Sequence, residues 1–174
     1  MRTKRIALVG SSSTGKTTVY ELLKNKLPKF DFINESTRSV AKYGFPINEK
    51  GTSKTQLAIS SFHLEALIHP GDLLLDRCYM DLMVYSNFML GIDFPSHSYI
   101  EDTWDRVKDV YTHYIYFPIE FKSVDDGVRS VNEEWRDKID SEFKRLLKEV
   151  KTPYLSVTGS PMQRVEQILK FIER

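Results

Sequence analysis

The chain has 174 residues, of which 41% are hydrophobic, and this is enough apolar material for one buried core. Acidic and basic residues nearly cancel, to a formal net charge of +1, so the sequence lacks the overall positive charge that drives non-specific binding to nucleic acids. The single cysteine, Cys78, excludes an internal disulfide and a cysteine-rich metal site.

The first apolar run follows a basic N-terminus but stops at Gly10, where hydroxyl residues begin. It is too short for a secretory signal, and no later run approaches the length of a membrane span. We therefore expect a cytoplasmic protein without a membrane partner, formed as one domain over residues 1–174.

Short apolar runs alternate with longer helical patterns along the whole chain. The short runs predict five strands, at 6–9, 30–33, 73–75, 113–117 and 154–157. Apolar residues at helical spacing predict helices at 16–27, 37–43, 54–68, 80–90, 100–110, 139–150 and 165–172. Residues 91–98 and the acidic segment 120–132 have little periodicity and are predicted as loops, the second of them part of a lid over residues 120–137.

This alternation favours an α/β fold, a five-stranded parallel sheet between two layers of helices. The clearest local signal lies directly after the first strand, where residues 10–17 match the pattern G-x-x-x-x-G-K-[ST] of a P-loop, or Walker A motif. The alternative is a Ser/Gly-rich turn that ends in Lys-Thr by chance, and the flanking strand and helix argue against it.

Each fixed position of the motif has a chemical role. The two glycines let successive backbone N–H groups point at phosphate oxygens, and the following helix adds its N-terminal dipole. Lys16 is expected to reach the β- and γ-phosphates of ATP, and Thr17 to ligate Mg²⁺. The residues expected to hold the nucleotide are Gly10, Ser11, Ser12, Ser13, Thr14, Gly15, Lys16, Thr17 and Thr18.

Two carboxylates follow predicted strands, Glu35 after the second and Asp76 after the third. In parallel sheets ligands bind beyond the carboxyl ends of strands, so either residue is a candidate to hold Mg²⁺ or to orient an attacking hydroxyl. Asp76 resembles the Walker B carboxylate, with a helix N-cap as its structural alternative. Arg38 and Arg77 are candidates for substrate contacts or for ion pairs that fix these acids.

Arg129 and Arg136 lie in the predicted lid. Arginines on a closing lid can stabilise the charge that develops during phosphoryl transfer, and we expect a catalytic role for both. Their alternative is a solvated helix face beside Glu133 and Glu134.

Several patches in chain order resemble the small P-loop kinases similar to the ribosylnicotinamide kinase domain of NadR. They comprise residues 10–18, 34–38, 56–64, 74–76 and 126–130, with Arg136 beyond. The resemblance implies a nucleoside-kinase-like fold, an acceptor pocket near Glu35 and Asp76, a lid containing the two arginines, and Thr158 and Gly159 beside the adenine of ATP.

The leading hypothesis is an ATP- and Mg²⁺-dependent kinase that acts on a nucleoside- or nucleotide-like small molecule. A second hypothesis keeps the chemistry but makes the acceptor a hydroxymethylated base or an end in DNA, as in phage DNA. A third, from another class, is a regulatory nucleotide-binding ATPase. Homo-oligomer formation is compatible with all three.

Overall fold

The computed structural model describes residues 3–89, 91–122 and 132–173. Its strands form one five-stranded sheet in the order β2-β3-β1-β4-β5, in which all neighbours are parallel. The strands are β1 Arg5–Val9, β2 Asp31–Ile33, β3 Leu73–Asp76, β4 His113–Tyr116 and β5 Tyr154–Ser156. The predicted α/β fold with a parallel five-stranded sheet is confirmed.

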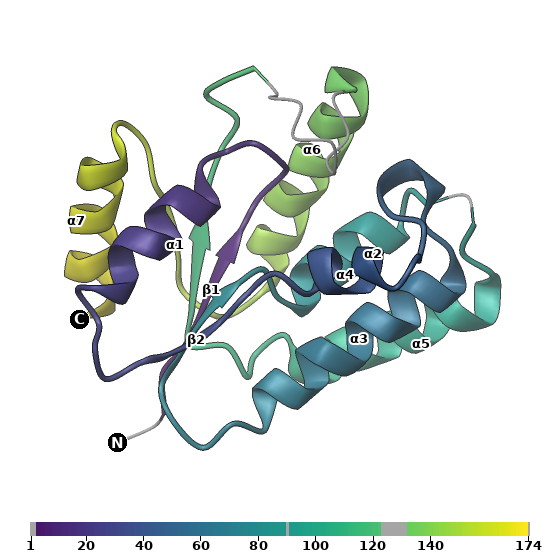
Figure 1. Ribbon diagram of the computed structural model, residues 1–174, viewed down its shortest axis with the longest axis horizontal. Helices are drawn as coiled ribbons and strands as arrows, with labels where there is room; N and C mark the ends of the chain where they lie inside the picture. Colours follow the sequence, from purple (N-terminus) through teal and green to yellow (C-terminus); the bar gives the residue numbers. More distant parts are fainter. Residues whose placement is uncertain (1–2, 90, 123–131, 174) are drawn as a thin grey trace.

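Helices cover both faces of the sheet, as Figure 1 shows. They are α1 Lys16–Lys24, α2 Ser36–Lys42, the 3₁₀ helix η1 Asn48–Lys50, α3 Ser53–Leu67, α4 Tyr79–Ser86, α5 Phe94–Val107, α6 Glu133–Glu149 and α7 Pro161–Ile172. None of these helices combines the length and apolarity that crossing a membrane requires.

The alternation of side chains along β1 explains the three layers. Ile6 and Leu8 pack into a core with α1 and α7, whereas Ala7 and Val9 pack into a second core with α2 to α6. All four side chains are fully buried. A central strand that is apolar on both faces is what a parallel sheet between two helical layers requires.

The second helical layer differs from the prediction at α5. Residues 91–98 were expected to form a loop, but α5 begins at Phe94. Asp93 caps this helix by accepting a hydrogen bond from the Ser96 N–H at 2.8 Å, and Pro95 occupies its first turn. The prediction was wrong because it followed hydrophobic periodicity, and the buried residues of α5 begin only at Ile100.

Capping also moves the starts of α6 and α7 ahead of their apolar stripes. The Asn132 side chain accepts from the Trp135 N–H at 3.1 Å, and the Ser160 side chain accepts from the Gln163 N–H at 3.3 Å. At the other end, α4 stops at Ser86, four residues before the predicted end.

The sheet order creates a switch point at β1. The chain leaves β1 through α1 on one face of the sheet, whereas it leaves the neighbouring strands β3 and β4 through α4 and α6 on the other face. The carboxyl end of β1 therefore opens into a crevice between diverging connections. Residues 10–17 lie at this point, and β3, which carries Asp76, is the neighbouring strand.

Candidate functional site

Backbone conformation shapes the loop at residues 10–17, which we call the cradle. Gly10, Ser13 and Gly15 have φ values of 134°, 54° and 86°, in the left-handed region that favours glycine. A Cβ on Gly10 would lie 2.5 Å from the carbonyl oxygen of Phe117, so the chain passes β4 too closely for any side chain. Helix α1 then begins at Lys16, directly after Gly15.

The Lys16 ammonium lies inside the cradle. Its Nζ donates to the carbonyl oxygens of Gly10 at 2.7 Å and Ser11 at 2.6 Å, and to Thr14 Oγ1 at 3.1 Å. The side chain is buried, so its positive charge lies inside the loop that the sequence predicts to bind phosphate. Thr17 and Thr18 are exposed on the first turn of α1.

Asp76 faces the cradle from the end of β3. Thr17 Oγ1 donates to Asp76 Oδ2 at 3.3 Å, which brings together the two oxygen groups predicted to hold a metal. Burial raises the pKa of Asp76, and the charges of Lys16 and Arg77 partly oppose that rise. The alternative of a helix cap does not apply, because α4 is capped by Cys78.

These two oxygen groups fit magnesium, a hard cation that is often held by one or two protein oxygens together with substrate phosphates and water. No cluster of three or more His, Cys, Asp or Glu side chains suited to a metal occurs among the described residues. The site therefore suits a metal that arrives with a phosphate ligand.

Glu35 and Arg77 form an ion pair beside the cradle. Arg77 Nε donates to Glu35 Oε1 at 2.6 Å, and Arg77 Nη1 donates to Asp81 Oδ1 at 2.8 Å. Burial lowers the pKa of Arg77, but the surrounding groups, of which Glu35 acts most strongly, outweigh burial and hold the pKa well above its ordinary value. Arg38 approaches Glu35 Oε2 at 3.4 Å with a half-exposed side chain.

Arg77 also has a strained backbone, with a φ of 77° directly after β3. Such a conformation is uncommon for a residue with a side chain and is characteristic of functional sites. Asp81 holds it in place from one helical turn away, since its other oxygen, Oδ2, accepts from the Cys78 N–H at 2.9 Å. Sequence reasoning missed Asp81, although a carboxylate four residues after an arginine was a detectable signal.

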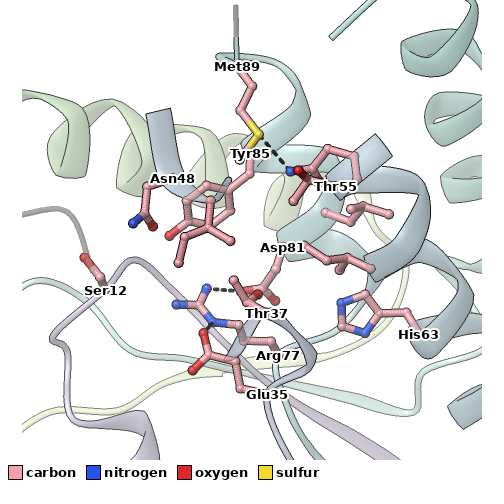
Figure 2. A pocket seen from close by; sticks show the side chains of 14 residues that line it. Ser12, Glu35, Thr37, Asn48, Thr55, His63, Arg77, Asp81, Tyr85 and Met89 are labelled. Carbon is pink, nitrogen blue, oxygen red and sulfur yellow. Dashed lines mark hydrogen bonds and ion pairs between the residues drawn. The ribbon is translucent and has the colours of Figure 1, made fainter. Parts of the chain in front are cut away.

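Glu35, Arg77 and Asp81 line a pocket that is partly open to solvent. Figure 2 shows Glu35 and Arg77 at one side of the pocket, Thr55 and Met89 at the opposite side, and Tyr85 between them. Ser12 belongs to both the pocket and the cradle. The pocket and the phosphate cradle are therefore adjacent.

His63 also lines the pocket, and burial, with a smaller contribution from Arg77, lowers its pKa to about 4. The side chain is 5% exposed and is neutral at physiological pH.

Arg136 contacts the outside of the cradle. Its Nε donates to the Ser12 carbonyl oxygen at 2.9 Å and its Nη2 to the Ser13 carbonyl oxygen at 3.1 Å, and the side chain is 1% exposed. The predicted lid role of Arg129 falls on a residue outside the described ranges, as do residues 126–130 of the patch that carried the resemblance.

A second buried arginine, Arg164 of α7, was missed by sequence reasoning. It donates to the carbonyl oxygens of Thr14 at 2.7 Å and Gly159 at 2.9 Å, and it also pairs with Glu120. Gly159, one of the two residues expected beside adenine, is thereby joined to the cradle. No local sequence signal distinguishes Arg164 from a surface arginine.

The chain shares its fold with solved nucleoside and nucleotide kinases. A deoxyadenosine kinase from M. mycoides with dCMP and dCDP bound aligns with a TM-score of 0.76 at 16% identity, covering 97% of this chain and 98% of that one. A thymidylate kinase from Candida albicans aligns at 0.69 and 17% identity, covering 99% and 92%. At these identities the likeness shows the P-loop NTPase fold.

A NadR protein in complex with NR aligns with a TM-score of 0.79 at 20% identity. The alignment covers 99% of this chain but 51% of the NadR chain, so this protein spans about half of that structure.

No curated protein sequence matches the chain significantly. A sequence model of the AAA domain family, AAA_28, matches residues 5–164, from the first strand through the cradle and both carboxylate-bearing strand ends to Arg164. With nearly the whole chain matched, the protein belongs to this AAA domain family.

Proposed function

We propose that the protein is a kinase that transfers the γ-phosphoryl group of ATP to a nucleoside- or nucleotide-like acceptor. The observation that carries the proposal is that Ser12 belongs both to the phosphate cradle and to the wall of an adjacent pocket. A nucleotide switch needs the cradle alone, whereas a kinase needs a second pocket next to the γ-phosphate.

The donor side of the reaction follows from the cradle. Lys16 turns from the carbonyl oxygens of Gly10 and Ser11 onto the β- and γ-phosphates when ATP binds, because phosphate oxygens carry more negative charge. Thr17 and Asp76 would hold Mg²⁺, which would supply positive charge to offset that of the phosphates. The loop at Thr158 and Gly159 borders the adenine.

The acceptor side assigns different roles to the two carboxylates. Asp76 contacts Thr17 and is the candidate metal ligand, while Glu35 lines the pocket and is the candidate base that orients the acceptor hydroxyl. Arg77 positions Glu35. Arg129, in the lid over residues 120–137 of a single domain, supplies positive charge for the transition state. Arg136, predicted for the same role, instead fixes the cradle through the Ser12 and Ser13 carbonyls.

The NadR-like kinases are the group whose chemistry this proposal follows. It is supported by the patches at residues 10–18, 34–38 and 74–76, and by the shared fold. A NadR protein binds NR, and we extend to this chain the general reaction, phosphoryl transfer to a ribose-bearing acceptor.

The test is acceptor-dependent release of ADP, measured across nucleosides, nucleoside monophosphates and DNA oligomers. A kinase releases ADP rapidly only with its acceptor, and Lys16→Ala abolishes that release. Equal hydrolysis with and without every acceptor would identify an ATPase instead, and activity that survives Lys16→Ala would refute the cradle as the donor site.

Glu35→Gln and Asp76→Asn separate the two carboxylate roles. We expect Glu35→Gln to lose turnover while Mg·ATP binding is retained, and Asp76→Asn to lose the dependence on Mg²⁺ concentration. The reverse pattern would exchange the assignments.

A further inference from the structure

We propose that the acceptor is an uncharged nucleoside whose base edge is read by Gln56, and not a nucleoside monophosphate or a DNA end. This rests on the proposed function, because it takes the pocket beside the cradle as the acceptor site. It narrows the acceptor to one of the classes that the fold accommodates.

The charge of the pocket wall is the first argument. Among its described lining residues, two carboxylates, Glu35 and Asp81, face one guanidinium, Arg77, which gives a net charge of −2 + 1 = −1. The three side chains are 5% to 9% exposed, so water screens these charges weakly. A dianionic phosphate ester placed here is repelled, whereas a neutral hydroxyl is not.

The availability of donors gives the same result. Two nitrogens of Arg77 already donate to carboxylates at 2.6 and 2.8 Å. Arg38 lies 3.4 Å from Glu35, but its side chain is 44% exposed and it does not line the pocket. A phosphate that accepted from the remaining N–H groups of Arg77 would lie beside the two buried carboxylates, whose negative charge would oppose it.

Gln56 supplies the second, independent observation. It lines the pocket and is 1% exposed, and its Oε1 is buried without a hydrogen-bond partner in the described structure. Its Nε2 donates to the thioether sulfur of Met89, a weak acceptor. Rotating the amide by 180° would leave the nitrogen without an acceptor and would place the oxygen against a sulfur that has no hydrogen to donate, so this buried amide lacks a proper partner in either orientation.

Buried polar groups without partners are rare in folded proteins, and in a pocket they indicate a ligand group that completes them. The complement of a side-chain amide is a flat edge with a donor beside an acceptor, and nucleobases present such edges. Ile59, Leu82 and Tyr85 add apolar and aromatic surface for the faces of a ring.

The positions of the two features fit one molecule. Figure 2 shows Met89, the partner of Gln56, across the pocket from Glu35. A nucleoside with its base at Gln56 therefore extends its sugar hydroxyl toward Glu35 and Ser12, next to the cradle.

Binding measurements test the inference without depending on turnover. Wild-type protein is first saturated with Mg²⁺ and a non-hydrolysable ATP analogue, so that no monophosphate can occupy the cradle. Each common ribo- and deoxyribonucleoside is then titrated against its own 5′-monophosphate by calorimetry, with a DNA hairpin as a third ligand. We expect at least one nucleoside to bind tenfold or more tightly than its monophosphate and the hairpin.

Two variants test the named groups. Gln56→Leu should weaken binding of that nucleoside at least tenfold, and Gln56→Glu should change which base binds best. Asp81→Asn should narrow the gap between nucleoside and monophosphate, whereas the matched control Asp105→Asn, on the exposed surface of α5, should leave it unchanged.

A monophosphate or hairpin that binds as tightly as every nucleoside overturns the inference, as does failure of all nucleosides to bind or an unchanged affinity in Gln56→Leu. ADP release with a monophosphate acceptor would leave the kinase proposal standing while this inference fails. Tight nucleoside binding without any phosphoryl transfer would support this inference and contradict the kinase proposal.

Discussion

Arg164 donates a hydrogen bond from Nη1 to the carbonyl oxygen of Thr14 at 2.7 Å, although 150 positions separate the two residues. Together with the bonds from Arg136 to Ser12 and Ser13, it holds three successive carbonyl groups of the cradle. The C=O and N–H of a trans peptide point in opposite directions. Holding these carbonyls on the outside therefore turns the next N–H groups toward the inside, where a phosphate needs them.

Arg164→Met should weaken the binding of Mg²⁺ with an ATP analogue about tenfold, which is about 1.4 kcal/mol. The variant retains the apolar stem but loses the bonds to Thr14 and Gly159. Arg164→Lys should restore little, since one ammonium cannot serve both carbonyls and Glu120. Calorimetry measures the affinity, with Arg145→Met, an exposed change on α6, as the control. A lower melting temperature with unchanged affinity for the ATP analogue would show that Arg164 stabilises the fold and does not shape the cradle.

Gly10→Ala should lower the free energy of unfolding by about 2 kcal/mol or more and abolish nucleotide binding. The new Cβ would lie 2.5 Å from a backbone oxygen of Phe117, so the cradle or β4 must move. Gly44→Ala is the matched control, because Gly44 also has a positive φ, 83°, but open space around it. Urea unfolding should show a loss of about 1 kcal/mol there. Equal losses at the two sites would contradict the role of close approach.

Asp76→Asn should stabilise the metal-free protein at neutral pH while it removes activity. Burial raises the pKa of Asp76 in the folded state, so folding takes up protons and stability falls as the pH rises above 3.8. The neutral amide of the variant carries no charge to bury, so the variant does not lose this stability as the pH rises. Urea unfolding of wild type and variant at several pH values measures it, and Asp105→Asn provides an exposed control. A destabilised Asp76→Asn protein would mean that the contacts of the carboxylate outweigh its desolvation.

His63 should make the protein sensitive to acid between pH 6.5 and 4. Because burial lowers its pKa to about 4, the unfolded chain binds a proton in this interval that the folded protein does not. Stability is therefore lost as the pH falls, by about 3 kcal/mol over the interval. The difference between wild type and His63→Gln in urea unfolding isolates this contribution from the carboxylates. Parallel curves for the two proteins would show that His63 does not titrate differently on folding.

The predicted strand ends placed Glu35 and Asp76 on the correct side of the sheet, because apolar runs that end in a charge are a local signal. The sequence could not predict which residue each of the two carboxylates contacts. Asp76 meets Thr17 and Glu35 meets Arg77 because β3 lies between β1 and β2, and strand order cannot be read from periodicity. The start of α5, in contrast, has a local signal in its cap, Asp93. The first turns of this helix bury no apolar residue, so hydrophobic periodicity does not reveal them.

The sequence by itself determined the cradle, since two glycines, a lysine and a threonine at fixed spacing act within a single turn of chain, and it determined the sheet through the alternation of its apolar runs. Only the tertiary structure decided what surrounds the cradle. Arg164 reaches Thr14, and Gln56 meets Met89, through contacts between elements far apart in the sequence. Such contacts depend on how helices pack on the sheet. For that reason the sequence alone predicts the proposed donor site, whereas the proposed acceptor pocket is found only in the folded structure.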